Sequence, residues 1–124
     1  MKPIPIVLHG VIDYTAVLIF AAAPVALGLH NGPALLSYAL AAVHLLMTLL
    51  TDFSAGAVRV VPLWVHNWVE RLVGPGLILL AFVPLVGNTQ TAQAFFIGMG
   101  VIIFAVERLT GYAATHRTTV NGRT

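Results

Sequence analysis

Four long apolar runs, joined by short polar connections, take up most of this 124-residue chain, and they cover roughly residues 4–29, 34–51, 62–86 and 92–110. A membrane-spanning helix needs about 20 apolar residues in a row, with a range of about 17 to 25. The runs are continuous and do not alternate between apolar and polar residues, which argues against strands. The sequence therefore predicts an all-α, polytopic membrane protein with four transmembrane helices.

The composition agrees with a bilayer as the surroundings of the chain. Charged residues make up 8% of the chain and hydrophobic residues 59%, whereas charged residues form about a quarter of an ordinary soluble domain. The formal net charge of +2 is explained by membrane orientation and lipid headgroups, so no nucleic-acid partner is expected. The absence of cysteine excludes disulfides and thiolate metal sites.

The basic residues indicate how the helices are oriented. All six fall on one predicted side of the membrane: Lys2, Arg59, Arg71, Arg108, Arg117 and Arg123. The opposite connections, at 28–33 and 87–92, contain no lysine or arginine. The positive-inside rule therefore places both termini in the cytoplasm, with the chain in the cell inner (plasma) membrane. We expect one transmembrane domain over residues 1–110 and a short cytoplasmic tail over 111–124.

The first and third runs begin alike. A shift of 57 residues superposes three residue pairs: Pro5 on Pro62, His9 on His66, and Asp13 on Glu70. The chain therefore reads as two tandem helical hairpins, with repeat 1 at about 3–52 and repeat 2 at about 60–110. Because each hairpin crosses the membrane twice, both would enter from the same side and form a parallel internal repeat.

Residues four apart on a helix share a face, so the histidine and the acid of each pair lie together near the cytoplasmic helix ends. With the remaining acids and nearby arginines they form a predicted polar layer: His9, Asp13, Asp52, Arg59, His66, Glu70, Arg71, Glu107 and Arg108. Charges at membrane depth pair with one another. We interpret the layer as a structural network in which Glu70 and Glu107 reach arginines of the other hairpin.

Two alternatives make this layer a ligand site. The pairs His9/Asp13 and His66/Glu70 supply imidazole and carboxylate groups, which suit a divalent first-row metal held between helices. His9 and His66 are also candidate axial ligands of a haem. His44 lies near the centre of the second predicted span, and an ionisable residue there is a functional hypothesis by default. A neutral His44 bonded to a neighbouring helix is the structural alternative.

Three segments carry a resemblance to a known family: VIDYTAVLIFAAAPVALGL, LLTDFSAGAVRVVP and VERLVGPGLILLAFVPLVG. They resemble the SPW-repeat type of small bacterial membrane protein, although only the proline of Ser-Pro-Trp is kept, at Pro24 and Pro84. The resemblance implies a helical fold and a membrane location. It implies no catalytic residue.

Two classes of function stay open. No nucleophile with an adjacent base, phosphate-binding loop or zinc-protease motif is present, so we do not expect an enzyme. The first class is a structural or accessory membrane subunit without a cofactor, whose surface meets another membrane protein or a second copy of the chain. The second is a small proton or ion transporter, or a membrane protein binding a metal or haem, that uses the two pairs and His44.

Overall fold

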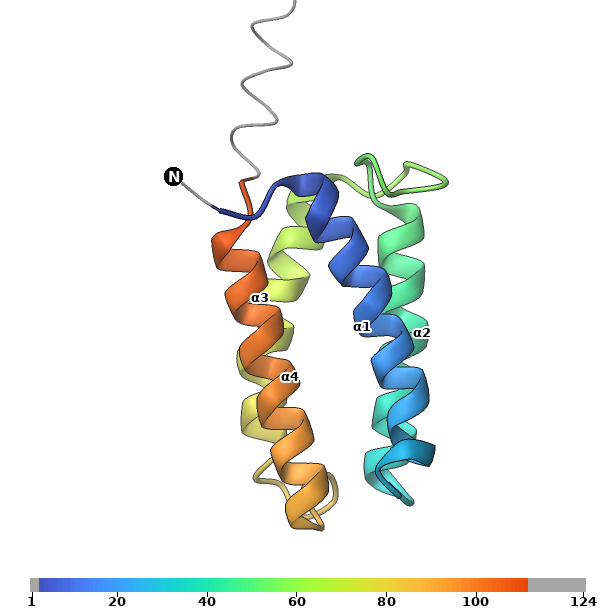
Figure 1. Cartoon of the computed structure of the whole chain (residues 1–124), viewed down its shortest axis with the longest axis vertical. Coiled ribbons are helices and arrows are strands. Elements are labelled where there is room, and N and C mark those ends of the chain that lie inside the picture. Colours follow the sequence, from blue (N-terminus) through green and yellow to red (C-terminus); the bar gives the residue numbers. More distant parts are fainter. Residues whose placement is uncertain (1–2, 112–124) are drawn as a thin grey trace, which may run out of the picture.

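The computed structural model describes residues 3–111, and this part of the chain consists of four α-helices without a β-strand (Figure 1). The helices are α1 (Ile6–Ala26), α2 (Gly32–Leu50), α3 (Leu63–Leu80) and α4 (Gln90–Leu109). The predicted all-α class with four helices is therefore confirmed. The predicted tail lies, apart from its first residue, outside the described residues.

Local chemistry explains where the helices begin and end. Thr89 caps α4, because its side-chain oxygen accepts a hydrogen bond of 3.1 Å from the Ala92 amide. The third apolar run was expected to continue to residue 86, but α3 ends at Leu80. The reason is Pro84, which disfavours helical geometry at the residue before it and donates no amide hydrogen bond. The segment after Leu80 forms turns instead, and Val83 donates to the Leu80 carbonyl at 2.9 Å.

The helices pack as two hairpins, α1 with α2 and α3 with α4 (Figure 1). The α3–α4 crossing is close because glycines face each other there. A Cβ on Gly100 would lie 2.6 Å from the Gly74 carbonyl oxygen, and a Cβ on Gly74 would lie 3.0 Å from the Gly100 carbonyl oxygen. Only residues without a side chain allow these backbones to approach so closely.

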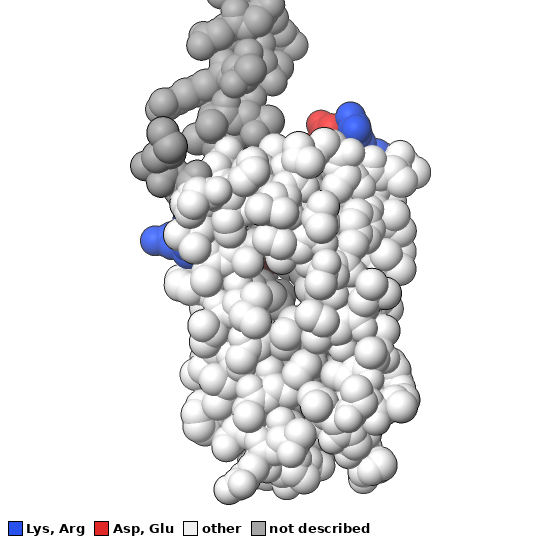
Figure 2. Space-filling model, viewed as in Figure 1, with Lys and Arg blue, Asp and Glu red and all other residues white. Residues whose placement is uncertain are grey.

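Large apolar side chains cover the outside of the bundle, and charged side chains gather toward one end of it (Figure 2). Three helices, α1, α2 and α4, are long and apolar enough to cross a membrane. Helix α3 is not among them. The physical reason is its polar content, since His66, Asn67, Glu70 and Arg71 lie in its first half.

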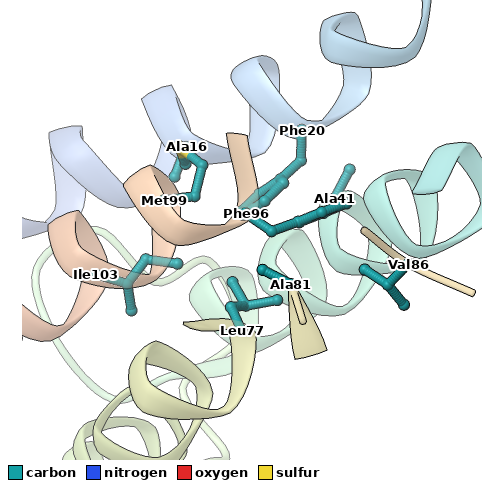
Figure 3. Close-up of a cluster of buried hydrophobic side chains, with 9 residues drawn as sticks. All are labelled: Ala16, Phe20, Ala41, Leu77, Ala81, Val86, Phe96, Met99 and Ile103. Carbon is teal, nitrogen blue, oxygen red and sulfur yellow. The ribbon is translucent and has the colours of Figure 1, made fainter. Parts of the chain in front are cut away.

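An apolar core joins the two hairpins (Figure 3). Phe20 of α1 and Phe96 of α4 are completely buried at its centre. The buried members of this core come from both hairpins: Ala16, Phe20, Ala41, Leu77, Ala81, Val86, Phe96, Met99 and Ile103. Another part of the interface is polar and contains the candidate site.

At the charged end, each hairpin begins against the last residues of the other. Ile4 donates its amide to the Leu109 carbonyl at 3.1 Å and accepts from the Gly111 amide at 2.9 Å. Val61, just before α3, donates to the Leu50 carbonyl at 2.7 Å and accepts from the Asp52 amide at 2.7 Å. The same two backbone bonds therefore connect α4 to the start of α1 and α2 to the start of α3.

Candidate functional site

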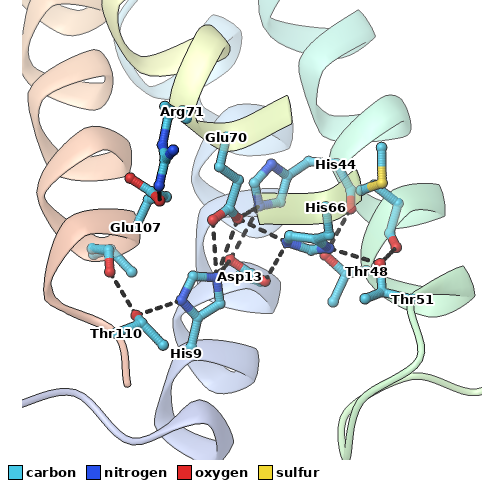
Figure 4. A network of polar contacts seen from close by, with 12 residues as sticks. His9, Asp13, His44, Thr48, Thr51, His66, Glu70, Arg71, Glu107 and Thr110 are labelled. Carbon is cyan, nitrogen blue, oxygen red and sulfur yellow. Dashed lines mark hydrogen bonds and ion pairs between the residues drawn. The ribbon is translucent and has the colours of Figure 1, made fainter. Parts of the chain in front are cut away.

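The two histidine–acid pairs meet at one centre between the hairpins (Figure 4). His9 and Asp13 come from α1, and His66 and Glu70 come from α3. One ligand atom of each residue lies within 4.8 Å of the corresponding atoms of the other three. Both helices carry the pair one to two turns from their first residue, and both start at the same end of the bundle, so the pairs lie at the same depth.

Each histidine contacts the acid of its own helix and that of the other hairpin. His9 Nε2 lies 3.3 Å from Asp13 Oδ1 and 3.0 Å from Glu70 Oε2. His66 Nε2 lies 2.9 Å from Glu70 Oε1 and 3.1 Å from Asp13 Oδ2. All four side chains are almost completely buried, with exposed fractions of 0 to 3%. These crossed contacts link the hairpins through both pairs.

His44 joins the same centre from α2. Its Nε2 lies 3.5 Å from Asp13 Oδ1 and 3.9 Å from Glu70 Oε1. The sequence suggested a separate position for His44 near the middle of its span, whereas the structure brings it to the two acids. We refer to His9, Asp13, His44, His66 and Glu70 as the His–carboxylate cluster.

Two buried threonines hold the rings of His9 and His66. His9 Nδ1 lies 2.7 Å from Thr110 Oγ1, and His66 Nδ1 lies 2.7 Å from Thr51 Oγ1. The hydroxyl of Thr110 donates to the Val106 carbonyl at 2.6 Å, and that of Thr51 donates to the Met47 carbonyl. Because each hydroxyl proton is already used, each oxygen accepts from the ring, and both rings carry their hydrogen on Nδ1.

Sequence reasoning missed these two threonines. Each follows the last residue of a hairpin's second helix, in LLT at 49–51 and RLT at 108–110. In a sequence, such a threonine looks like an ordinary helix end. The sequence did contain one signal. The two threonines occupy equivalent places in the two proposed repeats, just as His9 and His66 do.

The charges of the cluster must be balanced locally. Asp13 and Glu70 are each 3% exposed, and a buried carboxylate is costly without a compensating charge. Within residues 3–111, no lysine or arginine forms an ion pair with either acid. With hydrogen on Nδ1, a neutral ring would also turn its Nε2 lone pair toward the carboxylate oxygens. Each Nε2 therefore carries a proton, binds a cation, or accepts a hydrogen bond from a protonated carboxyl group.

A second, partly buried ion pair lies beside the cluster. Arg71 Nη2 is 3.0 Å from Glu107 Oε1, and Glu107 is 1% exposed. We expected Glu107 to reach an arginine of the other hairpin, but Arg71 and Glu107 belong to the same one. The close α3–α4 crossing at Gly74 and Gly100 explains this, since it brings Arg71 of α3 next to α4. Glu70, likewise expected to reach an arginine, contacts histidines instead.

The other residues of the predicted polar layer lie outside the cluster. Asp52 and Arg59 are exposed in the connection after α2, where Arg59 Nε donates to the Gly56 carbonyl at 3.5 Å. Arg108 is exposed on α4, and its guanidinium carbon lies 5.8 Å from the centre of the Phe104 ring. The polar layer therefore consists of a buried cluster, a neighbouring ion pair and an exposed rim.

Two small cavities adjoin the cluster. One, of about 20 Å³, is lined by Asp13, His44 and Glu70 together with apolar residues of α1 and α4. The other, of about 30 Å³, lies between α2 and α3 and is lined by His44 and Glu70. A cavity needs about 10 to 15 Å³ of this kind of space to hold one water molecule. Each cavity therefore has room for one or two waters beside the acids.

Comparisons with protein-family profiles, with curated proteins and with solved structures found no match for this chain. The resemblance to SPW-repeat proteins therefore stays a prediction, and the chemistry of the cluster carries the functional argument.

Proposed function

We propose that this protein is a non-enzymatic, structural or accessory membrane protein, in which the His–carboxylate cluster fastens two transmembrane hairpins to each other. One observation carries the proposal. His9 bonds Thr110 through one ring nitrogen and Glu70 through the other, both in the second hairpin. His66 bonds Thr51, and its other ring nitrogen lies 3.1 Å from a carboxylate oxygen of Asp13, with both partners in the first hairpin. Each ring therefore bridges the hairpins from both of its nitrogens.

The exposed surface of α3 supports the proposal that this helix also crosses the membrane, which gives four spans rather than three. Its polar residues His66 and Glu70 are buried, while Trp64, Leu72 and Leu79 are 66 to 72% exposed. A helix of 18 residues is about 27 Å long, close to the thickness of the hydrocarbon core of a bilayer, which is about 30 Å. Polar residues inside a spanning helix normally face the bundle interior. The outward face of α3 is therefore suitable for lipid.

The distribution of charge supports the proposed orientation. The described arginines lie toward the end of the bundle that contains the cluster: Arg59, Arg71 and Arg108. The turns at the opposite end, between α1 and α2 and between α3 and α4, contain no lysine or arginine. The positive-inside rule then places the cluster near the cytoplasmic face, with both termini on that side. In a bacterium this corresponds to the inner membrane.

The matched contacts support a parallel internal repeat. His9 with Thr110 corresponds to His66 with Thr51, and the two backbone bonds of Ile4 correspond to those of Val61. In both cases the start of one hairpin contacts the end of the other. Two copies of one hairpin, related by an axis along the membrane normal, would produce this arrangement.

Cysteine labelling tests the membrane topology, because the chain contains no cysteine of its own. We expect Asn31→Cys and Asn88→Cys to react with an impermeant maleimide added outside intact cells. Ala57→Cys, in the connection after α2, should react only after the membrane is opened. Labelling of all three positions from outside, or recovery of the protein in the soluble fraction, would refute the four-span topology.

A further inference from the structure

We propose that the His–carboxylate cluster binds one divalent transition-metal ion, with zinc as the best-matched example. The ligands are the Nε2 atoms of His9 and His66 and carboxylate oxygens of Asp13 and Glu70. His44 lies beside them as a further nitrogen ligand. This goes beyond the structural role, because the fastening contacts would then be made through an ion.

The spacing of the ligand atoms fits a single ion. Zinc binds histidine nitrogen and carboxylate oxygen at about 2.0 to 2.2 Å, which separates neighbouring ligand atoms by about 3.3 Å in a tetrahedron and about 2.9 Å in an octahedron. The four nitrogen–oxygen distances between the histidines and the two acids are 2.9, 3.0, 3.1 and 3.3 Å. One ligand atom of each of the four residues lies within 4.8 Å of the other three, and ligands of a single ion at these bond lengths lie at most about 4.2 Å apart. Binding would therefore draw the most distant ligand atoms toward the centre by less than about 1 Å.

Hydrogen bonding satisfies this centre poorly. His9 Nε2 has Glu70 Oε1 and Asp13 Oδ1 at 3.3 Å and Glu70 Oε2 at 3.0 Å, so that a single N–H would be divided among three oxygens. Among the described residues, Asp13 Oδ2, Glu70 Oε2 and His44 Nε2 are buried and lack a hydrogen-bond partner of suitable geometry. Buried polar atoms are rarely left so. A cation attracts all of these atoms at once, because its field has no preferred direction.

The threonines supply the outer support typical of metal sites. A metal-binding histidine nearly always donates its second ring N–H to an oxygen, which fixes the ring and directs the other nitrogen at the ion. Thr110 and Thr51 accept from Nδ1 of His9 and His66, each at 2.7 Å. Both Nε2 atoms consequently face the same centre. Each hairpin supplies one such threonine, in each case directly after the end of its second helix.

Charge and ligand type narrow the choice of ion. Two carboxylates and one divalent cation sum to zero, which suits a site with exposed fractions of 0 to 3%. Imidazole nitrogen favours zinc, iron, nickel or copper over magnesium and calcium, which prefer oxygen. The adjoining cavities, of about 20 and 30 Å³, leave no space for a porphyrin. The cavity lined by Asp13, His44 and Glu70 could hold a water ligand.

Zinc titration of the detergent-purified full chain, first stripped with a chelator, tests this proposal. We expect one zinc ion per chain, and X-ray absorption should show only nitrogen and oxygen ligands at about 2.0 to 2.2 Å. His66→Gln should abolish stoichiometric binding. Because His66 also links the two hairpins, Thr51→Val and Thr110→Val provide a second measurement that leaves all ligands in place. In these two variants zinc affinity should fall about 10- to 100-fold.

A matched control separates ring support from a general effect of threonine. Thr15 has the same bond from its hydroxyl to a backbone carbonyl, at 2.8 Å to Val11, but it is exposed and makes no hydrogen bond to a histidine within residues 3–111. Thr15→Val should bind zinc as the wild type does. Absence of zinc binding by the folded wild type, or equal affinity in the Thr51→Val, Thr110→Val and Thr15→Val proteins, would overturn the proposal. The fastening role would survive that result, because it requires no ion.

Discussion

Replacing Thr51 or Thr110 by valine removes a ring support and hardly changes the shape of the side chain. Each hydroxyl is completely buried and lies 2.7 Å from a histidine Nδ1. Valine leaves that N–H buried without an acceptor, which costs about 1 to 3 kcal/mol. For a chain of this size, 1 kcal/mol corresponds to about 4 °C in the unfolding midpoint. We therefore expect each variant to unfold about 4 to 12 °C below the wild type.

The double variant, Thr51→Val with Thr110→Val, tests whether the two ring supports are energetically coupled through the cluster. Both rings approach Glu70 Oε1, His9 Nε2 at 3.3 Å and His66 Nε2 at 2.9 Å. Groups that share a partner are energetically coupled, typically by about 0.5 to 3 kcal/mol. Because the first substitution already loosens the contact at the shared Glu70 oxygen, less remains for the second to remove, and the combined loss of stability should be smaller than the sum of the two single losses. The assay is thermal unfolding in one detergent, followed by circular dichroism on metal-free protein.

Thr48 provides the control for this measurement. It is also completely buried, and its hydroxyl donates to the His44 carbonyl at 2.8 Å, but among the described residues its side chain makes no hydrogen bond to a ring. Thr48→Val should consequently lose much less stability than Thr51→Val. If the three valine variants unfold at the same temperature, the threonine hydroxyls do not support the rings, and the assignment of hydrogen to Nδ1 is wrong.

Two further predictions concern the packing around the cluster. Gly100→Ala should destabilise the protein by about 1 to 3 kcal/mol through overpacking, because its Cβ would meet the α3 backbone at 2.6 Å, whereas Gly98→Ala, with nothing within 4 Å, should be neutral or stabilising in the same unfolding assay. Arg71→Met should cost about 3 to 5 kcal/mol, since it leaves a buried charge on Glu107, whose side chain is 1% exposed. Glu107→Gln should cost less, because the Arg71 side chain is 34% exposed and keeps some water. Equal losses within either pair of variants would contradict this description of the α3–α4 contact.

The sequence was informative wherever one helix determines the answer. The four helices follow from the length of the apolar runs, and the shared face of His9 with Asp13, or of His66 with Glu70, follows from helical periodicity. The predicted repeat also indicated that both pairs lie at the same level of the bundle. None of these inferences depends on how two helices pack against each other.

The parts that could not be predicted all depend on contacts between helices. His44 joins the cluster because of how α2 packs beside α1 and α3, and no local pattern encodes that rotation. Arg71 pairs with Glu107 in its own hairpin because Gly74 and Gly100 let α3 and α4 approach closely. Glycines occur throughout the apolar runs, and Gly98, two residues from Gly100, faces open space. Their spacing alone did not identify the crossing point.

The paired backbone bonds at Ile4 and Val61 have a consequence for the order of the chain. The start of α1 is held against the end of α4 in the same way as the start of α3 is held against the end of α2. Of these two junctions, only the one between α2 and α3 is also bridged by a connecting segment of the chain. Either junction could therefore carry the covalent link. A circularly permuted gene, opened between residues 52 and 60 and closed by a linker of similar length from residue 111 to residue 3, should encode the same bundle with the order of its hairpins exchanged.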